Sequence, residues 1–239
     1  MGRILCVTGT GTDIGKTAFS LALLLWAREK RLNAGYIKVV QCGSRLPHSE
    51  PFQGDAEWIN AAVPDNFECS ALYNFTDAVS PHLAAERAGA WLDSEWILDR
   101  VDSASRRLDF LVVEGAGGVA TPYSREGLSL ADIAAQGEWP CLIVGSPDLG
   151  TLHHTRTTAH FLLAAGAQIA GFAMSQTGPN SPNIYDDNRD LLSALLRIPF
   201  MGLLPFCPGL QKRLPLPPAM ALILAQAIEK GISQGKISP

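Results

Sequence analysis

The segment GTGTDIGKT at residues 9–17 carries the strongest chemical signal in the sequence. It follows a short apolar run and opens a helical pattern, which is the context of a phosphate-binding P-loop. The backbone N–H groups of such a loop converge on phosphate oxygens, and the helix N-terminus adds a favourable partial charge. Lys16 is expected to reach the outer phosphates, and the Thr17 hydroxyl is expected to bind a magnesium ion. Since Gly9 and Gly15 enclose five residues instead of the usual four, the loop is a lengthened variant.

Two carboxylates are candidates for the same magnesium ion. Glu114 ends the apolar run LVVE and is followed by GAGG, whose glycines let the backbone pass close to a ligand. A carboxylate at the tip of such a strand is where P-loop proteins keep a second magnesium contact. Asp55 starts a helical pattern, where on its own it fits a helix N-cap. Beside a P-loop and Glu114, it is also a candidate magnesium ligand.

Lys38 lies inside the apolar run YIKVV, where an ammonium group is costly unless it meets an anion or emerges at the sheet edge. Near the end of a predicted strand, it is expected to point toward the P-loop crevice. The alternative is a lysine on an edge strand, with a buried stem and an ammonium group that reaches water.

The elements that must position these residues alternate along the chain. Continuous apolar runs predict strands covered on both faces, so we expect an α/β fold: a doubly wound, mainly parallel sheet flanked by helices, as in P-loop NTPases. In such sheets, ligands bind beyond the carboxyl ends of the strands. No low-complexity linker or internal repeat divides the chain, so residues 1–239 are expected to form a single domain. Strands are predicted at residues 4–8, 35–40, 110–114, 141–145, 169–175 and 200–204, and helices at 17–30, 55–62, 81–90, 94–108, 152–165, 183–196 and 218–230.

The composition excludes several classes of protein. Lys plus Arg number 19 against 23 Asp plus Glu, a net charge of −4, so no basic excess favours a nucleic acid partner. The five cysteines are scattered without a CxxC pair, which argues against a zinc knuckle or a disulfide framework. The apolar stretches are too short for a signal-peptide core or a membrane span. We therefore expect a soluble, cytoplasmic protein without a membrane partner.

Further motifs follow in a characteristic order: YIKVVQCG at 36–43, GDA at 54–56, SPH at 80–82, VVEGAGG at 112–118, LADIA at 130–134 and DLGTLHHT at 148–155. Together with the lengthened P-loop, they resemble the dethiobiotin synthetase family from the first strand to about residue 205. The resemblance implies an ATP- and magnesium-dependent ring closure, in which carbon dioxide and 7,8-diaminononanoate become dethiobiotin with release of ADP and phosphate. This is a step of biotin synthesis. It also implies a homodimer with active sites at the subunit interface.

The resemblance assigns roles to residues of this chain. Lys16 would contact the ATP phosphate and the carbamate, Lys38 would stabilise the carbamate, and Thr12 would contact the diamine or its carbamate. Magnesium would be held by Thr17, Asp55 and Glu114. The residues expected at the nucleotide are Thr12, Asp13, Ile14, Gly15, Lys16, Thr17, Asp55, Glu114, Gly117, Ser175, Gln176 and Pro205. Those expected at the diamine are Thr12, Lys38 and Cys42, with its carboxylate received across the subunit interface by the backbone amides of Gly150, Thr151, Leu152 and His153.

The sequence departs from the family pattern at several of these positions. Asp13 replaces the usual glutamate, Val39 replaces a proline after the lysine, and Cys42 replaces a small hydroxyl residue. The asparagine that commonly reads the nucleotide base aligns with Ser175, which is followed by Gln176. We therefore expect weaker discrimination of ATP from other nucleotides. The segment from residue 207 onward shows no strong resemblance.

The sequence bears on three alternative functions. Amide-forming P-loop ligases of corrinoid side chains usually carry a glutaminase domain, for which 239 residues leave no room. Partitioning-type ATPases, which act as binding switches, have a second lysine in a Lys-Gly-Gly at the start of the loop, where this chain has Thr8-Gly9-Thr10. A paralogue with the same fold and a changed substrate is left open by the departures at Val39, Cys42 and Ser175.

Overall fold

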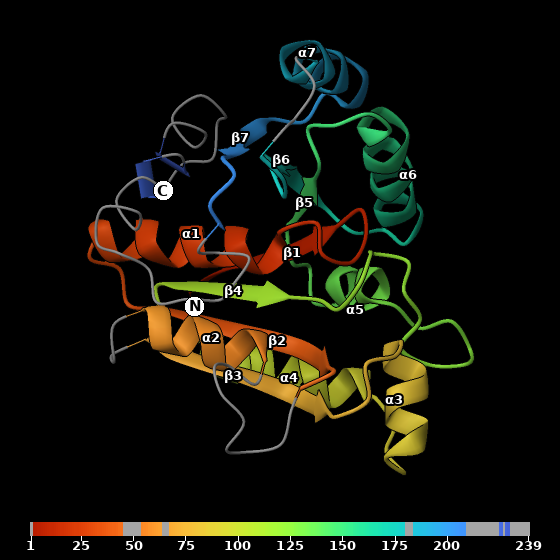
Figure 1. Ribbon diagram of the computed structural model, residues 1–239. Helices are drawn as coiled ribbons and strands as arrows, with labels where there is room; N and C mark the ends of the chain where they lie inside the picture. Colours follow the sequence, from red (N-terminus) through yellow and green to blue (C-terminus); the bar gives the residue numbers. More distant parts are fainter. Residues whose placement is uncertain are drawn as a thin grey trace.

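A parallel sheet runs through the part of the chain that the computed structural model describes, residues 2–44, 54–63, 67–179, 184–208, 225–226 and 228–229. Its seven strands lie in the spatial order β3-β2-β4-β1-β5-β6-β7, and every pairing is parallel (Figure 1). The predicted doubly wound parallel sheet is thereby confirmed. The strands are β1 (Arg3–Gly9), β2 (Ala34–Cys42), β3 (Glu68–Phe75), β4 (Phe110–Glu114), β5 (Cys141–Gly145), β6 (Ile169–Ser175) and β7 (Phe200–Leu204).

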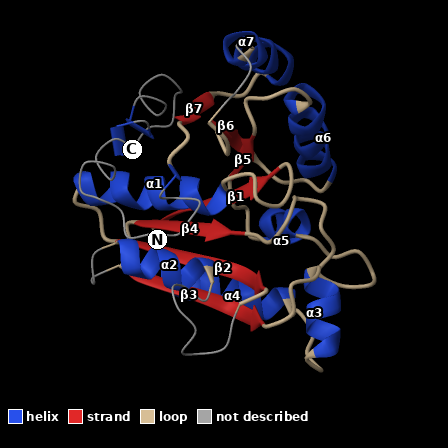
Figure 2. Cartoon of the chain, in the orientation of Figure 1, coloured by secondary structure: helices blue, strands red, loops and turns tan. Residues whose placement is uncertain are grey.

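Helices cover both faces of the sheet (Figure 2). Helices α1 and α2 pack on one face, and α4, α5, α6 and α7 contribute to the core of the other, to which α3 also adds buried residues. The helices are α1 (Lys16–Glu29), α2 (Asp55–Ala62), α3 (Pro81–Arg87), α4 (Ser94–Ser105), α5 (Leu130–Gln136), α6 (Thr151–Ala164) and α7 (Tyr185–Leu196). Among the described residues, no helix has the length and apolarity needed to cross a membrane.

Successive side chains of the central strand β1 point alternately into the two hydrophobic cores, one on each face of the sheet. Leu5 and Val7 belong to the core under α1, whereas Cys6 between them belongs to the core on the opposite face. Successive side chains of a strand point to opposite faces, so a strand covered on both sides reads as one continuous apolar run. This is why the sequence pattern identified the central strands.

The position of the functional residues follows from the strand order. From β1 the chain moves to β2 on one side, and from β4 it crosses to β5 on the other, so the order reverses around β1. The crevice at such a reversal is where doubly wound sheets bind ligands. The P-loop follows β1 there, and the register pairs Lys38 of β2 with Glu114 of β4. Adjacent strands thus bring two distant parts of the sequence together.

Several sequence predictions differ from the structure. Strand β3 and helix α5 were not predicted: β3 is an edge strand whose residues are mostly half-buried or exposed and form no apolar run, and α5 is only seven residues long. Helices α3 and α4 end three residues before their predicted ends, at Arg87 and Ser105. The helix predicted at residues 218–230 lies mostly outside the described residues, although residues 225–226 and 228–229 are helical.

Candidate active site

The P-loop wraps around the ammonium group of its lysine. Lys16 is buried, and its Nζ donates a hydrogen bond of 2.7 Å to the carbonyl oxygen of Gly11. Burial lowers the pKa of Lys16 to about 8, and repulsion from Lys38 adds to this effect. In the described part of the chain, Lys16 forms no ion pair with a carboxylate. A desolvated cation with a neutral partner is well suited to receive an anion, such as a phosphate group.

Gly15 holds the end of the P-loop against the neighbouring strand. Its φ of 91° lies in the left-handed region, which glycine adopts without strain. A Cβ atom at this position would also collide with Oγ of Ser175 at the end of β6. The loop therefore requires glycine here for both its conformation and its packing.

The carboxylate of Glu114 is the centre of a buried hydrogen-bond network. It is fully buried at the end of β4 and accepts from four side chains of α1 and β2. No oxygen of this carboxylate is left without a donor, so the network fixes β4, α1 and β2 relative to one another. The donors are Thr17 Oγ1 at 2.8 Å, Ser20 Oγ at 2.7 Å, Tyr36 OH at 3.0 Å and Lys38 Nζ at 2.6 Å.

Lys38 joins two carboxylates. Its Nζ lies 2.6 Å from Glu114 Oε1 and 2.6 Å from Asp55 Oδ2. Burial alone would lower the pKa of Lys38, but the two carboxylates outweigh burial and raise it above its ordinary value. Lys38 therefore carries its charge throughout the physiological range. Of the two interpretations drawn from the sequence, the structure supports an ammonium group that meets anions, and β2 is an interior strand.

Helix α2 is capped by a residue of the sheet and not by Asp55. The N-cap position is Gly54, and the Oε1 atom of Gln41 in β2 accepts a hydrogen bond of 3.0 Å from the backbone N–H of Ala56. The simple N-cap interpretation of Asp55 is wrong, because its carboxylate turns to Lys38 instead. Gln41 thus holds the start of α2, and with it Asp55, at the end of β2.

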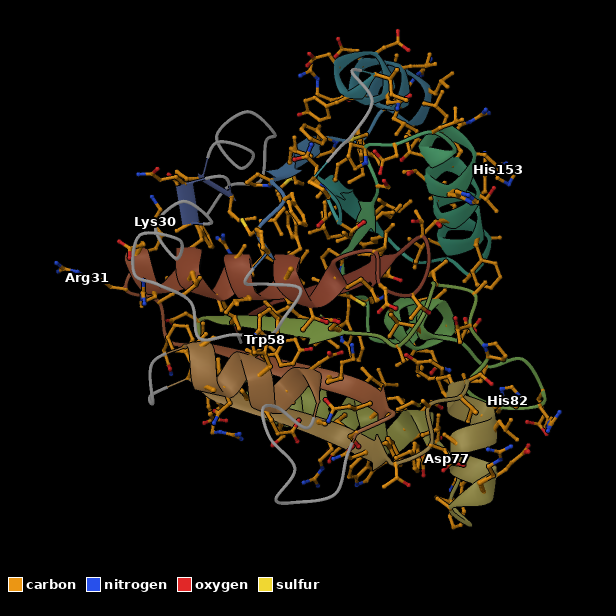
Figure 3. All side chains as sticks on the ribbon, viewed as in Figure 1. Lys30, Arg31, Trp58, Asp77, His82 and His153 are labelled. Atoms are coloured by element: carbon orange, nitrogen blue, oxygen red, sulfur yellow. The ribbon has the colours of Figure 1, made fainter. Side chains whose placement is uncertain are left out.

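One cavity of about 760 Å³ opens beyond the carboxyl ends of the strands. On one side its wall includes Ala78, Ser80 and Pro81, and on the other Leu204 and Cys207. Trp58 also lines it (Figure 3), and its buried indole N–H has no hydrogen-bond partner among the described residues. Most of the residues expected at the nucleotide and the diamine meet in this wall, namely Thr12, Asp13, Gly15, Lys16, Thr17, Lys38, Cys42, Asp55, Gly117, Ser175, Gln176 and Pro205.

Some expected site residues lie elsewhere. Glu114 sits below the cavity wall, behind the side chains that donate to it, and Ile14 packs against the core under α1. The segment from Gly150 to His153 forms the start of α6 and does not line the cavity; it comprises Gly150, Thr151, Leu152 and His153. Figure 3 shows His153 on α6, and the preceding Leu149 is 90% exposed.

The cavity wall near β6 and β7 contains Ser175 and Gln176, at the position where the family commonly has an asparagine that reads the nucleotide base. Ser175 is buried against Gly15, so its hydroxyl is enclosed by the P-loop. The side chain of Gln176 is held by the segment after β7, since its Oε1 accepts a hydrogen bond of 3.2 Å from the backbone N–H of Phe206. Gln176 can therefore still offer the cavity its amide N–H₂ group and the second lone pair of Oε1, but the position of this amide is set by the segment after β7.

Sequence reasoning missed three residues that organise the site. Ser20 follows Lys16 by one helical turn, and Tyr36 precedes Lys38 by two strand positions, so both lie on the faces that carry the predicted residues. These spacings could have identified them as partners of Glu114. Gln41 could not have been found in this way, because its partner belongs to a distant helix.

The donors near Lys38 suit a magnesium ion. Thr17, Asp55 and Glu114 offer a hydroxyl and two carboxylates, and oxygen donors of this kind, supplemented by phosphate oxygens and water, are what magnesium prefers. No group of three or more His, Cys, Asp or Glu side chains that could form a complete protein cage occurs among the described residues. The donor set therefore fits an ion that is shared with a phosphate ligand.

Comparison with known proteins assigns the chain to a family. A family model described as an AAA domain matches residues 3–213. The ATP-dependent dethiobiotin synthetase BioD of Anoxybacillus flavithermus is 30% identical over 199 residues, which cover 83% of this chain and 90% of that protein. The chain belongs to the dethiobiotin synthetase family. A second member of this family, from Geobacillus kaustophilus, is 31% identical over 216 residues, 89% of each protein.

Solved structures share the fold of this dethiobiotin synthetase family member. The cell division ATPase MinD of Pyrococcus furiosus has a TM-score of 0.59 at 17% identity and covers 96% of this chain and 99% of that chain. The septum site-determining protein MinD of Pyrococcus horikoshii, complexed with Mg-ADP, has a TM-score of 0.59 at 18% identity, with 96% and 94% covered. At these identities the likeness concerns the fold alone.

Proposed function

We propose that this chain is an ATP-dependent dethiobiotin synthetase, which joins carbon dioxide to 7,8-diaminononanoate and closes the ring with release of ADP and phosphate. One observation carries the proposal beyond family membership. A single cavity contains the P-loop lysine on one side and the Lys38–Asp55 ion pair on the other. A phosphate donor and a carbamate therefore have separate cationic partners within one enclosed space.

The charges of the site support this chemistry. Lys38 is paired with Asp55 and Glu114, whereas the ammonium group of Lys16 donates its hydrogen bond to a neutral carbonyl oxygen. Phosphorylation of a carbamate brings together several negative oxygens, and fixed ammonium groups stabilise them without reorganisation. Lys16 serves the transferred phosphate and Lys38 the carbamate. Thr12 at the cavity wall contacts the amine or the carbamate, and holding both reactants in place supplies much of the rate.

We assign the magnesium ligands to Thr17 and Asp55, which line the cavity, and to Glu114, which lies behind them and would exchange one of its donors for the ion or a water bound to it. Magnesium, when bound, would neutralise negative charge on the ATP phosphates. The residues of the chain do the remaining work: Thr17 and Glu114 fix the start of α1 against β4, and Lys38 keeps the two carboxylates together.

We further propose a homodimer in which residues 150–153 act on the cavity of the other subunit. This segment lies at the N-terminus of α6, where backbone N–H groups favour a carboxylate. It does not reach the cavity of its own chain, and the neighbouring Leu149 is 90% exposed. Both facts agree with a substrate carboxylate that is bound across a two-fold interface.

The test of the activity is a dethiobiotin-forming assay. Purified protein is incubated with 7,8-diaminononanoate, bicarbonate, magnesium and ATP, CTP or GTP, and the product is measured by mass spectrometry. Dethiobiotin that depends on both diamine and nucleotide supports the proposal. Nucleotide hydrolysis without dethiobiotin would indicate a paralogue with another substrate.

The test of the interface uses two complementary variants. Lys16→Gln inactivates the cavity, whereas Leu152→Pro removes one backbone N–H from the first turn of α6, where N–H groups have no intrahelical partner. When equal amounts of the two variants are refolded together, about half of the dimers contain one copy of each variant. Each mixed dimer has one intact site of two, so about a quarter of the wild-type activity should return. No recovery in a mixture that light scattering shows to be dimeric would place residues 150–153 outside the active site.

A further inference from the structure

The SPH motif at residues 80–82 places a serine–histidine pair at the wall of the cavity. Ser80 lines the cavity, and its Oγ lies 3.1 Å from Nδ1 of His82. Ser80 occupies the N-cap position of α3 but makes no side-chain capping hydrogen bond. The hydroxyl is thus committed to the imidazole instead of to the helix.

The pair lies on the carbamate side of the cavity. The segment before α3 packs on the end of β2, where the backbone N–H of Gly43 donates to the carbonyl oxygen of Asp77. The backbone N–H of His82 donates to the carbonyl oxygen of Pro122, in the loop that follows β4. Ser80 therefore stands between the ends of the two strands that carry Lys38 and Glu114. Figure 3 shows His82 toward the outside of the molecule, at the start of α3.

Ring closure needs a proton acceptor at this place. The amine attacks in its neutral form, because a protonated amine has no lone pair to donate. As its nitrogen bonds to the carbonyl carbon, the nitrogen gains positive charge and must lose a proton to an acceptor. Three titratable groups near Lys38 are committed or unsuited. Glu114 is saturated by four donors, Asp55 is paired with Lys38, and burial raises the pKa of Cys42 to about 11, which keeps its thiol protonated.

We propose that Ser80 and His82 form a proton relay for the ring-closing amine, an inference that rests on the proposed function. The amine nitrogen donates its electron pair to the carbonyl carbon, and phosphate leaves with the electron pair of the carbon–oxygen bond. The amine proton passes to Ser80 Oγ while the Ser80 hydroxyl proton passes to His82 Nδ1. The imidazolium then loses one proton to solvent and returns to the Nε2–H tautomer, in which Nδ1 can accept from Ser80 again. Ser80 is the catalytic residue because it touches the amine, and His82 acts through it.

Two charged side chains near His82 form an ion pair with each other. Glu86 lies one turn along α3, and Arg125 from the loop after β4 binds it through two hydrogen bonds of 2.7 and 2.8 Å. Arg125 lowers the pKa of Glu86, and His82 adds a smaller effect, so a carboxylate is present near the ring. The third neighbour, the Pro122 carbonyl, is neutral. An imidazole is the side chain best matched to proton transfer near neutral pH.

The experiment compares His82→Gln and Ser80→Ala with the wild type across pH 6 to 9, with the matched control His160→Gln on an exposed position of α6. We expect kcat of both relay variants to fall about a hundredfold, the lower range for general base catalysis, while KM for ATP stays unchanged. His82→Gln should lose the fall of kcat at acidic pH, and added imidazole should restore part of its rate. Ser80→Thr, which keeps the hydroxyl, should retain activity, and His160→Gln should behave as wild type.

The outcomes separate the relay from the proposed function. Wild-type kcat in His82→Gln, or an equal loss at every pH without a response to imidazole, would overturn the relay and leave the pair a structural feature of α3. A wild-type protein that forms no dethiobiotin would instead overturn the proposed function and the relay with it. If Ser80→Ala does not fold, as judged by circular dichroism, His82→Gln and its imidazole response decide the question.

Discussion

Removing the charge of Glu114 should destabilise the whole fold as well as the site. In Glu114→Gln, the amide keeps one acceptor oxygen but turns an N–H₂ group toward side chains that are themselves donors. Four donors from α1 and β2 converge on the native carboxylate, so at least one of them loses its partner. The buried ammonium of Lys38 also loses one of its two carboxylates.

The magnitude follows from burial and from the remaining partner. Breaking a buried ion pair by removing one member costs about 3–5 kcal/mol. Asp55 still compensates Lys38, so we expect the lower end, about 3 kcal/mol, for Glu114→Gln. Asp55→Asn should cost less, about 1–2 kcal/mol, because its side chain is 16% exposed and Lys38 keeps the fully buried Glu114.

Urea unfolding followed by circular dichroism measures both losses. With an m-value of about 3 kcal/mol/M, Glu114→Gln should lower the unfolding midpoint by about 1 M. The control Glu29→Gln, at the exposed end of α1, should change the free energy of unfolding by less than about 0.5 kcal/mol. The double variant Lys38→Met/Glu114→Gln should lose less than the sum of its single variants, because no unpaired ammonium is left. A loss below about 1 kcal/mol for Glu114→Gln, or a larger loss for Asp55→Asn, would refute this account of the network.

Three further predictions concern the ligands. Lys16→Gln should reduce dethiobiotin formation at least about a hundredfold, because a neutral amide cannot offset phosphate charge; retention of more than about a tenth of the activity would contradict the P-loop assignment. Asp55→Asn should raise the magnesium concentration for half-maximal activity about tenfold, and an unchanged metal titration would leave Asp55 only its ion pair with Lys38. Because Gln176 Oε1 accepts from Phe206 N–H, its amide is held by the segment after β7 and is not free to turn its donor and acceptor together to the adenine edge, so kcat/KM for ATP should exceed that for GTP or CTP by less than about tenfold. A preference above about a hundredfold would show that another residue reads adenine.

The sequence by itself determined the chemistry that depends on local order. A glycine-rich loop between a strand and a helix requires only neighbouring residues, and so does the carboxylate at the tip of β4. The central strands were also readable, since burial on both faces leaves an uninterrupted apolar run. The order of the motifs added the family resemblance, which the relatives confirm.

Tertiary structure alone decided how these pieces work together. The sequence left Asp55 as either a cap or a ligand, and the choice depended on Gln41, which takes over the capping of α2. Strand β3 escaped prediction because an edge strand is half exposed and its pattern is set by the neighbour it pairs with. The four donors to Glu114 come from elements far apart in the chain, and the parallel register of β2 and β4 brings them together. Such contacts depend on the strand order, which local propensity and periodicity do not encode.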